Sequence, residues 1–256
     1  MRSVETYGQG LRRLLRETGA PVSQEAVRAY AAQLEHRAAR HHALDALRFY
    51  ANWARREGIH PVPAWRIPTV REPTRLPRVW PPARWAAFQT VAQEAPQPAR
   101  VILGLLAGCA LRSAEVSSTT RVDLERLRET GMLYMIKKGG DQGAVPAPTW
   151  VREAVDDLLA RRGRRWVMIG DLLARNGGAG ARRQALGRLV AWACRKAGME
   201  EPGTPHEVRH NVAVEILRNG GTLEHVRRML RHTGYGQLWR YAELTGDDLL
   251  AKRDLK

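Results

Sequence analysis

The chain has 256 residues, of which 44% are hydrophobic, enough for one large domain or two modest ones. It holds 42 lysines and arginines against 26 acidic residues, and this net charge of +16 predicts a polyanionic partner, although a basic protein with a merely solvated surface has the same composition. Two cysteines, Cys109 and Cys194, exclude a disulfide framework and a four-cysteine zinc site. Without a long apolar run or a signal-peptide core, we expect a cytoplasmic protein that has no membrane partner.

The first quarter of the chain predicts a small helical domain. Apolar residues recur at helical spacing from Tyr7 to Arg56. Prolines then cluster at positions 61, 63, 68, 73, 77, 81 and 82, which disfavours a continuous helix and favours an extended basic linker. We therefore expect a helical domain that binds the polyanionic partner over residues 1–75, with this linker at its end, and a second domain over residues 76–256.

The second domain is expected to be mainly α-helical with one small antiparallel sheet. Strand-prone residues flank the turn 139–141, in the segments 133–136 and 144–145. Helical periodicity occupies three longer segments: Ala99–Ala110, Val151–Arg161 and Arg182–Ala197. The fold class predicted for the whole chain is thus mainly α.

A strong helix start follows near residue 204. Thr204 is suited to the N-cap, Pro205 to the first helical position, and Glu207 to closing a capping box. His206 and Arg209, three residues apart, then share one face near the helix N-terminus, where backbone N–H groups already favour anions. This arrangement predicts a phosphate-binding site.

The same residues allow a second interpretation. His206 to His210 also spell H-E-x-x-H, the zinc-protease spacing, so a zinc metallopeptidase is an alternative. Against it stand the capping role of Glu207 and the cation Arg209 inside the motif. An ordinary capped helix with exposed histidines is the plainer alternative.

The residues that follow carry a more specific pattern. A short amphipathic helix is expected over 222–230, followed by Arg231-His232 and, nine residues after His232, by Arg240-Tyr241. The stretch from Thr204 to Tyr241 resembles the C-terminal signature of tyrosine recombinases: T-P-H-x-L-R-H, then L-G-H, then R-Y nine residues later. Upstream, A-L-R-S-A-E-V at 110–116 is similar to the family's G-L-R-x-S-E-L, and residues 137–146 resemble its lysine-bearing hairpin.

The resemblance implies a metal-independent enzyme that cleaves and rejoins DNA. A tyrosine attacks a phosphodiester, leaving a 3′-phosphotyrosine and a free 5′-hydroxyl, and because bond energy is kept no cofactor is needed. Carried over by motif, Arg112 and Arg209 would hold the non-bridging oxygens of the phosphate. His232 would add a third donor, His206 would assist proton transfer, and Tyr241 would be the nucleophile. Glu115 is expected to orient Arg112 or to pack near it in the helix that follows.

The leaving 5′-oxygen needs a proton, which lysine donates more readily than arginine. The chain has only five lysines, and two of them, Lys137 and Lys138, adjoin the expected hairpin turn. Strand alternation sends them to opposite faces, and the hairpin resemblance favours Lys138. A pair of solvated turn lysines is the alternative.

Several positions depart from the family pattern. Ala110 and Ala114 replace a glycine and a serine, Arg231 replaces the glycine of L-G-H, and Gly143 stands where a basic residue is common. Gln237-Leu238 replaces a threonine pair. None of these changes removes a group expected to be catalytic, so they indicate a divergent member.

The resemblance also implies partners. We expect double-stranded DNA and self-association to a tetramer on DNA, with 245–255 long enough to serve as an exchanged C-terminal arm. The function expected is that of a Xer-like site-specific recombinase or integrase. A type IB-like topoisomerase and a catalytically inactive DNA-binding protein are further alternatives.

Overall fold

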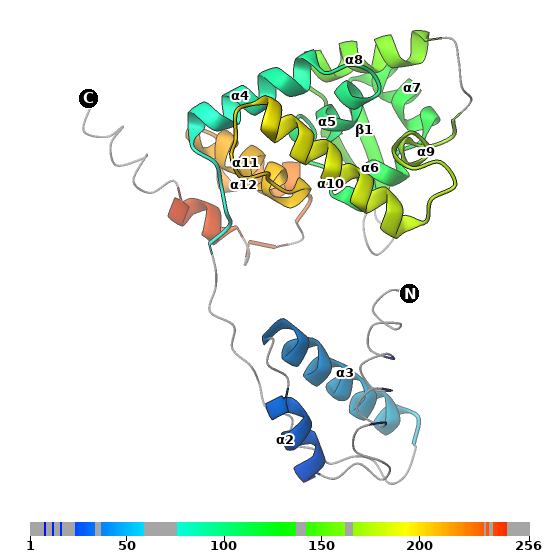
Figure 1. Cartoon of the computed structure of the whole chain (residues 1–256), viewed down its shortest axis with the longest axis vertical. Helices are drawn as coiled ribbons and strands as arrows, with labels where there is room; N and C mark the ends of the chain where they lie inside the picture. Colours follow the sequence, from blue (N-terminus) through cyan, green and yellow to red (C-terminus); the bar gives the residue numbers. More distant parts are fainter. Residues whose placement is uncertain are drawn as a thin grey trace, which may run out of the picture. The chain divides into compact units, whose positions relative to one another are not determined.

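In a computed structural model the chain divides into two compact units, residues 1–74 and residues 75–256 (Figure 1). The structure describes residues 24–33, 37–58, 76–136, 142–161, 166–232, 234–235 and 238–244, together with residues 8, 12 and 16. The linker residues 59–75 and the C-terminal arm 245–255 lie outside the described residues.

The first unit contains the helices α2 (Gln24–Gln33) and α3 (Arg37–Arg56). α3 is amphipathic, because its buried residues recur every three or four positions: Ala43, Leu44, Ala46, Leu47, Ala51 and Ala54. Arg55 and Arg56 are exposed in its last turn, where basic residues complement the helix dipole. The hydrophobic face of α3 thus supplies core to this unit.

The second unit is built almost entirely of helices (Figure 1). In chain order its elements are α4 (Pro82–Glu94), α5 (Ala99–Ala107), α6 (Ser113–Ser118), α7 (Arg121–Thr130), β1 (Met132–Ile136), β2 (Gln142–Pro146), α8 (Thr149–Ala160), α9 (Ile169–Leu173), α10 (Ala179–Lys196), α11 (Pro205–Arg218) and α12 (Leu223–Leu230). A further helical stretch covers 239–244. The predicted fold class, mainly α with a small antiparallel sheet, is confirmed.

The core of this unit forms around α5. Every residue of α5 from Val101 to Ala107 is buried, and the helix packs against α4, α8 and α11. Such all-round apolar character is typical of a central helix, whereas α12 is amphipathic and buries only Val226 and Leu230. α5 therefore fixes the position of the loop at its C-terminal end, which leads to Arg112.

The two strands form an antiparallel pair in which Leu133 lies opposite Val145, and both side chains are buried. On strand β1 the ring of Tyr134 lies 3.8 Å from the guanidinium carbon of Arg126 on α7. The turn between the strands, 137–141, lies outside the described residues, so Lys137 and Lys138 are not placed.

Two loops near the predicted site hold non-glycine residues in the left-handed region. Ala110, after α5, has φ 49°, and Arg231, at the C-cap of α12, has φ 53°. Glycine adopts this conformation with least strain, which explains why the related motifs carry glycine at both positions. Here alanine and arginine adopt the two left-handed turns.

Among the described residues, no helix combines the length and the apolar character that a membrane crossing requires.

Candidate active site

Helix α11 begins as the sequence predicts. The Thr204 hydroxyl accepts a hydrogen bond from the Glu207 N–H at 3.2 Å, and the Glu207 carboxylate accepts one from the Thr204 N–H at 3.3 Å. The indole N–H of Trp80 also reaches this carboxylate, at 3.4 Å. Glu207 is thereby held in a cap, while His206, Arg209 and His210 occupy the first turns of the helix.

Arg209 is buried, with only 3% of its surface exposed. Its guanidinium donates to the carbonyl oxygens of Ala110 and Leu230, so it joins the loop after α5 to the end of α12. Burial lowers the pKa of Arg209 to about 9, with the charges of Arg112 and Arg231 acting in the same direction, and the group stays cationic at neutral pH. A guanidinium has five N–H donors, so donors remain for an anion.

Arg112 is the N-cap of α6 and is 48% exposed. Its guanidinium donates to Glu115 at 2.8 Å, and its backbone N–H donates to the other oxygen of the same carboxylate at 2.7 Å. Burial alone would raise the pKa of Glu115, but Arg231 and the hydrogen bonds from Arg112 outweigh it and hold the pKa below its usual value. Glu115 thus lies next to Arg112, as expected.

A third arginine joins this carboxylate. The buried guanidinium of Arg231 lies 2.7 Å from Glu115 and donates to the Ala110 carbonyl at 3.3 Å, while Arg209 lies 3.9 Å from Glu115. One carboxylate is thus shared by three cations, which leaves a local excess of positive charge suited to an anion. In the sequence, Arg231 is noted only because it stands where the family motif has glycine. No local pattern predicted its contact with Glu115, which lies 116 positions away.

The three histidines adjoin the arginines. His206 and His210 lie one turn apart on α11, with ring centroids 4.2 Å apart. His232 follows α12, and burial lowers its pKa to about 4, with Arg209, Arg112 and Arg231 contributing in that order. Burial also lowers the pKa of His206, again helped by Arg209 and Arg112.

Tyr241, which is 4% exposed, lies against the same cluster. Its hydroxyl is 2.7 Å from Nδ1 of His210, and burial raises the pKa of the phenol while Arg209 and Arg240 oppose that shift. From the sequence, the only role considered for His210 was that of a zinc ligand, and its contact with Tyr241 was missed. Its position one turn after His206 already placed the two histidines on one face of the helix.

Tyr235, which lies three residues after His232 in the sequence, makes different contacts. Tyr235 is 46% exposed and its hydroxyl donates to Glu224 at 2.6 Å, with Arg227 beside the ring. Since Glu224 belongs to α12 and is paired with Arg227 and Arg228, Tyr235 is part of a separate surface network.

The structure brings most of the predicted site residues together: Arg112, Arg209, His206, His232 and Tyr241. Lys138 lies outside the described residues.

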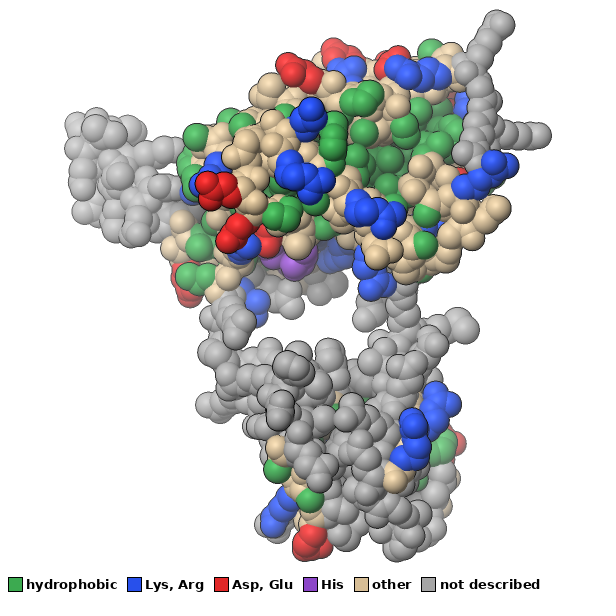
Figure 2. Space-filling model, viewed as in Figure 1, with side chains coloured by type: hydrophobic (Ala, Val, Ile, Leu, Met, Phe, Trp, Pro, Cys, Tyr) green, Lys and Arg blue, Asp and Glu red, His purple; other side chains and the backbone are tan. Residues whose placement is uncertain are grey.

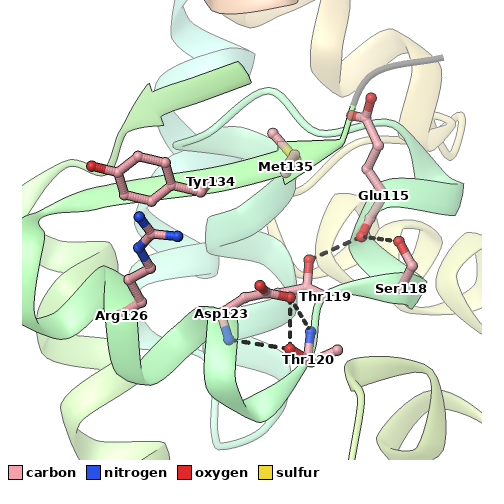
Figure 3. Close-up of a pocket in the computed structure, with 8 residues that line it drawn as sticks. All are labelled: Glu115, Ser118, Thr119, Thr120, Asp123, Arg126, Tyr134 and Met135. Carbon is pink, nitrogen blue, oxygen red and sulfur yellow. Dashed lines mark hydrogen bonds between the residues drawn. The ribbon is translucent and has the colours of Figure 1, made fainter. Parts of the chain in front are cut away.

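A cavity of about 450 Å³ shares Glu115 with the arginine cluster, and Figure 3 shows the residues that line it. Its lining comes from α6, the start of α7 and β1: Glu115, Ser118, Thr119, Thr120, Asp123, Arg126, Tyr134 and Met135. Figure 3 shows the cap of α7, in which Asp123 accepts hydrogen bonds from Thr120. Two carboxylates in this lining make it a poor phosphate site, so the arginine cluster, and not the cavity, is the candidate active site.

No group of three or more His, Cys, Asp or Glu in a metal-binding arrangement occurs within the part of the chain that the structure describes.

Comparison with known proteins gives the family. Residues 85–246 match the model of the phage integrase family, which is more than half of the chain, and the chain belongs to this family, that of the tyrosine recombinases. The resemblance found in the motifs is confirmed. Tyrosine recombinase XerC of Rhodospirillum centenum is 29% identical over 226 residues, which cover 84% of this chain and 64% of the relative. Tyrosine recombinase XerD of Listeria innocua is 25% identical over 150 residues, covering 57% of this chain and 50% of the relative.

Solved structures agree on the fold. XerH site-specific recombinase bound to its palindromic difH substrate superposes with a TM-score of 0.69 at 17% identity, covering 98% of this chain and 78% of that one. A lambda integrase dimer bound to a COC′ core site gives 0.66 at 14% identity, covering 92% and 89%. The chain spans about half to two thirds of the length of the curated relatives named above.

Proposed function

We propose that this chain is a site-specific DNA recombinase that cleaves and rejoins duplex DNA through a 3′-phosphotyrosine intermediate. The observation that carries the proposal is the position of the Tyr241 hydroxyl, held at His210 beside the buried cation Arg209. A phosphate placed there would meet a nucleophile and fixed positive charge together, as phosphoryl transfer requires. The DNA complexes of XerH and lambda integrase support a DNA substrate.

Each motif residue has a proposed role. Arg112 and Arg209 hold the non-bridging oxygens, His232 donates a third hydrogen bond, and His206 assists proton transfer. Tyr241 attacks the phosphorus, and Lys138, favoured over Lys137, protonates the departing 5′-oxygen. The five-donor guanidinium of Arg209 suits this role, because its bonds to two carbonyls leave further N–H groups for the phosphate.

The first unit is proposed to bind DNA together with the second, and the active assembly is proposed to be a tetramer on DNA in the cytoplasm. Support comes from the net charge of +16 and from the basic side chains on the viewed face of the second unit, where a histidine also reaches the surface (Figure 2). The two free, buried cysteines suit a reducing compartment.

Trapping the covalent intermediate tests the proposed function. We expect the protein, incubated with fragments of its source genome in the presence of a chelator, to form a protein–DNA adduct on Tyr241 with a free 5′-hydroxyl. Sequencing the trapped DNA should give one preferred site, and a nicked duplex of that site should then accumulate adduct. Adduct without exchange between two sites would favour a topoisomerase. Stoichiometric bound zinc, with activity lost in chelator and restored by zinc, would favour His206 and His210 as zinc ligands.

The binding of random duplex DNA should weaken steeply with salt. Each phosphate neutralised by an arginine or lysine releases counterions, so the logarithm of the affinity should fall by about 0.9 per contact for each tenfold rise in salt. Filter binding or fluorescence anisotropy over a salt series measures this slope. An affinity that does not change with salt would contradict a phosphate-binding surface.

A further inference from the structure

The contact between His210 and Tyr241 is not accounted for by the roles above. His210 lies on α11, and Nδ1 of its ring is 2.7 Å from the Tyr241 hydroxyl, with ring centroids 5.6 Å apart. Tyr241 is buried in the helical stretch 239–244, and its hydroxyl is directed at the half-buried imidazole of His210. An imidazole within hydrogen-bond reach of a nucleophilic hydroxyl is the arrangement by which enzymes activate such a nucleophile.

We propose that His210 is a further catalytic residue, the acceptor of the phenolic proton when Tyr241 attacks. This inference rests on the proposed function. As the Tyr241 oxygen bonds to phosphorus, its proton passes to Nδ1 of His210, the bond from phosphorus to the 5′-oxygen breaks, and that oxygen takes a proton from Lys138. Rejoining reverses each transfer, so His210 returns its proton to Tyr241 and no other reactant is consumed.

The charges around His210 keep it ready to accept a proton. Burial lowers its pKa to about 4, and the neighbouring groups that act in the same direction are His206, Arg209, His232 and Arg240. The imidazole is therefore neutral at neutral pH, and with its proton on Nε2 it offers Nδ1 as an acceptor. A bound phosphate offsets the positive charge of Arg209 and so raises the pKa of His210, making it a stronger base when substrate is present.

Tyr241 needs such an acceptor. Burial raises the pKa of its phenol, so the hydroxyl keeps its proton at neutral pH even though Arg209 and Arg240 favour the phenolate. His206 has a different position, because it is exposed and touches His210 edge-on at 4.2 Å between centroids. In this arrangement His206 assists the proton transfer through its contact with the ring of His210.

The variant His210→Asn tests the proposal. An asparagine amide places a polar atom near the position of Nδ1, so it preserves a hydrogen bond to Tyr241 but takes no proton. We expect adduct formation on the nicked duplex to slow by about 10² to 10⁴ at neutral pH in a single-turnover assay. The unaltered protein should lose rate as the pH falls through the pKa of His210. The rate of the variant should instead rise about tenfold for each unit by which the pH rises, because its Tyr241 must first form the phenolate.

His225→Asn is the matched control. His225 lies at the start of α12, where its ring accepts a hydrogen bond from the Thr222 N–H at 3.0 Å. It has no proposed role in the reaction. This variant should keep both the rate and the pH profile, and a thermal melt of each protein shows whether it folds. An unchanged rate in His210→Asn would overturn the proposal, and so would a uniform slowing that keeps the original pH profile, since that marks a residue which only positions Tyr241.

The proposed function and the role of His210 can be tested separately. If the unaltered protein forms no adduct with any fragment of its source genome, the proposed function fails, and the role of His210 fails with it. If the unaltered protein forms adduct and His210→Asn retains the acid limb of the pH profile, only the role of His210 is overturned.

Discussion

Replacing Tyr241 by phenylalanine is expected to abolish the covalent adduct while DNA affinity stays nearly unchanged. Only the hydroxyl is removed, and that oxygen is the proposed nucleophile, so no slower route to a 3′-linked product remains. The ring still fills its buried position, and the lost hydrogen bond to His210 is expected to cost about 1 kcal/mol of stability. Gel analysis of adduct on the nicked duplex, alongside a binding titration, separates the two effects.

Tyr235→Phe is the control for this experiment. Tyr235 is exposed and donates its hydroxyl to Glu224, so its loss should disturb a surface network and leave adduct formation intact. If Tyr241→Phe still forms a 3′-linked adduct, Tyr241 is not the nucleophile. The motif alignment of the whole C-terminal third would then need revision.

Local signals in the sequence were sufficient to predict the helix that carries His206 and Arg209. Thr204, Pro205 and Glu207 predicted the start of α11 because a cap depends on residues only three apart. The same signal was present in Thr120 and Asp123, which cap α7, and it was overlooked. α4 also begins at a proline, Pro82, which the sequence analysis treated only as a helix breaker.

The centre of the site depended on contacts that no local pattern carries. Arg231 was expected to be a tolerated departure from glycine. In the structure it adopts the left-handed turn at the end of α12, and its buried guanidinium pairs with Glu115 of α6. Likewise, His210 meets Tyr241 only because the stretch 239–244 folds back on α11. Sequence spacing suggested which residue types gather, whereas tertiary packing decided which atoms touch.

A second large effect is expected when Arg209 is replaced by lysine. Arg209 is buried and its guanidinium spans two carbonyls, those of Ala110 and Leu230. Its proposed role is to hold the phosphate. A lysine ammonium is a point charge that cannot reproduce this planar fork, so charge is kept but the geometry is lost. We expect adduct formation to slow by about 10² to 10³.

The substitution to lysine is preferred to Arg209→Ala because alanine would also take the side-chain donor from the Leu230 carbonyl, at about 1 to 3 kcal/mol, while the Ala110 carbonyl keeps its hydrogen bond from Arg231. Arg218→Lys provides the matched control, since it makes the same chemical change at the other end of α11. Thermal melts of both variants report stability, and single-turnover adduct formation on the nicked duplex reports catalysis. Because Arg209 is proposed to act on the phosphate and not on the proton, its variant should be slowed equally across the pH range, in contrast to His210→Asn. A rate for Arg209→Lys within about threefold of the Arg218→Lys rate would contradict the bidentate clamp, and the cluster would then stabilise the fold without holding the phosphate.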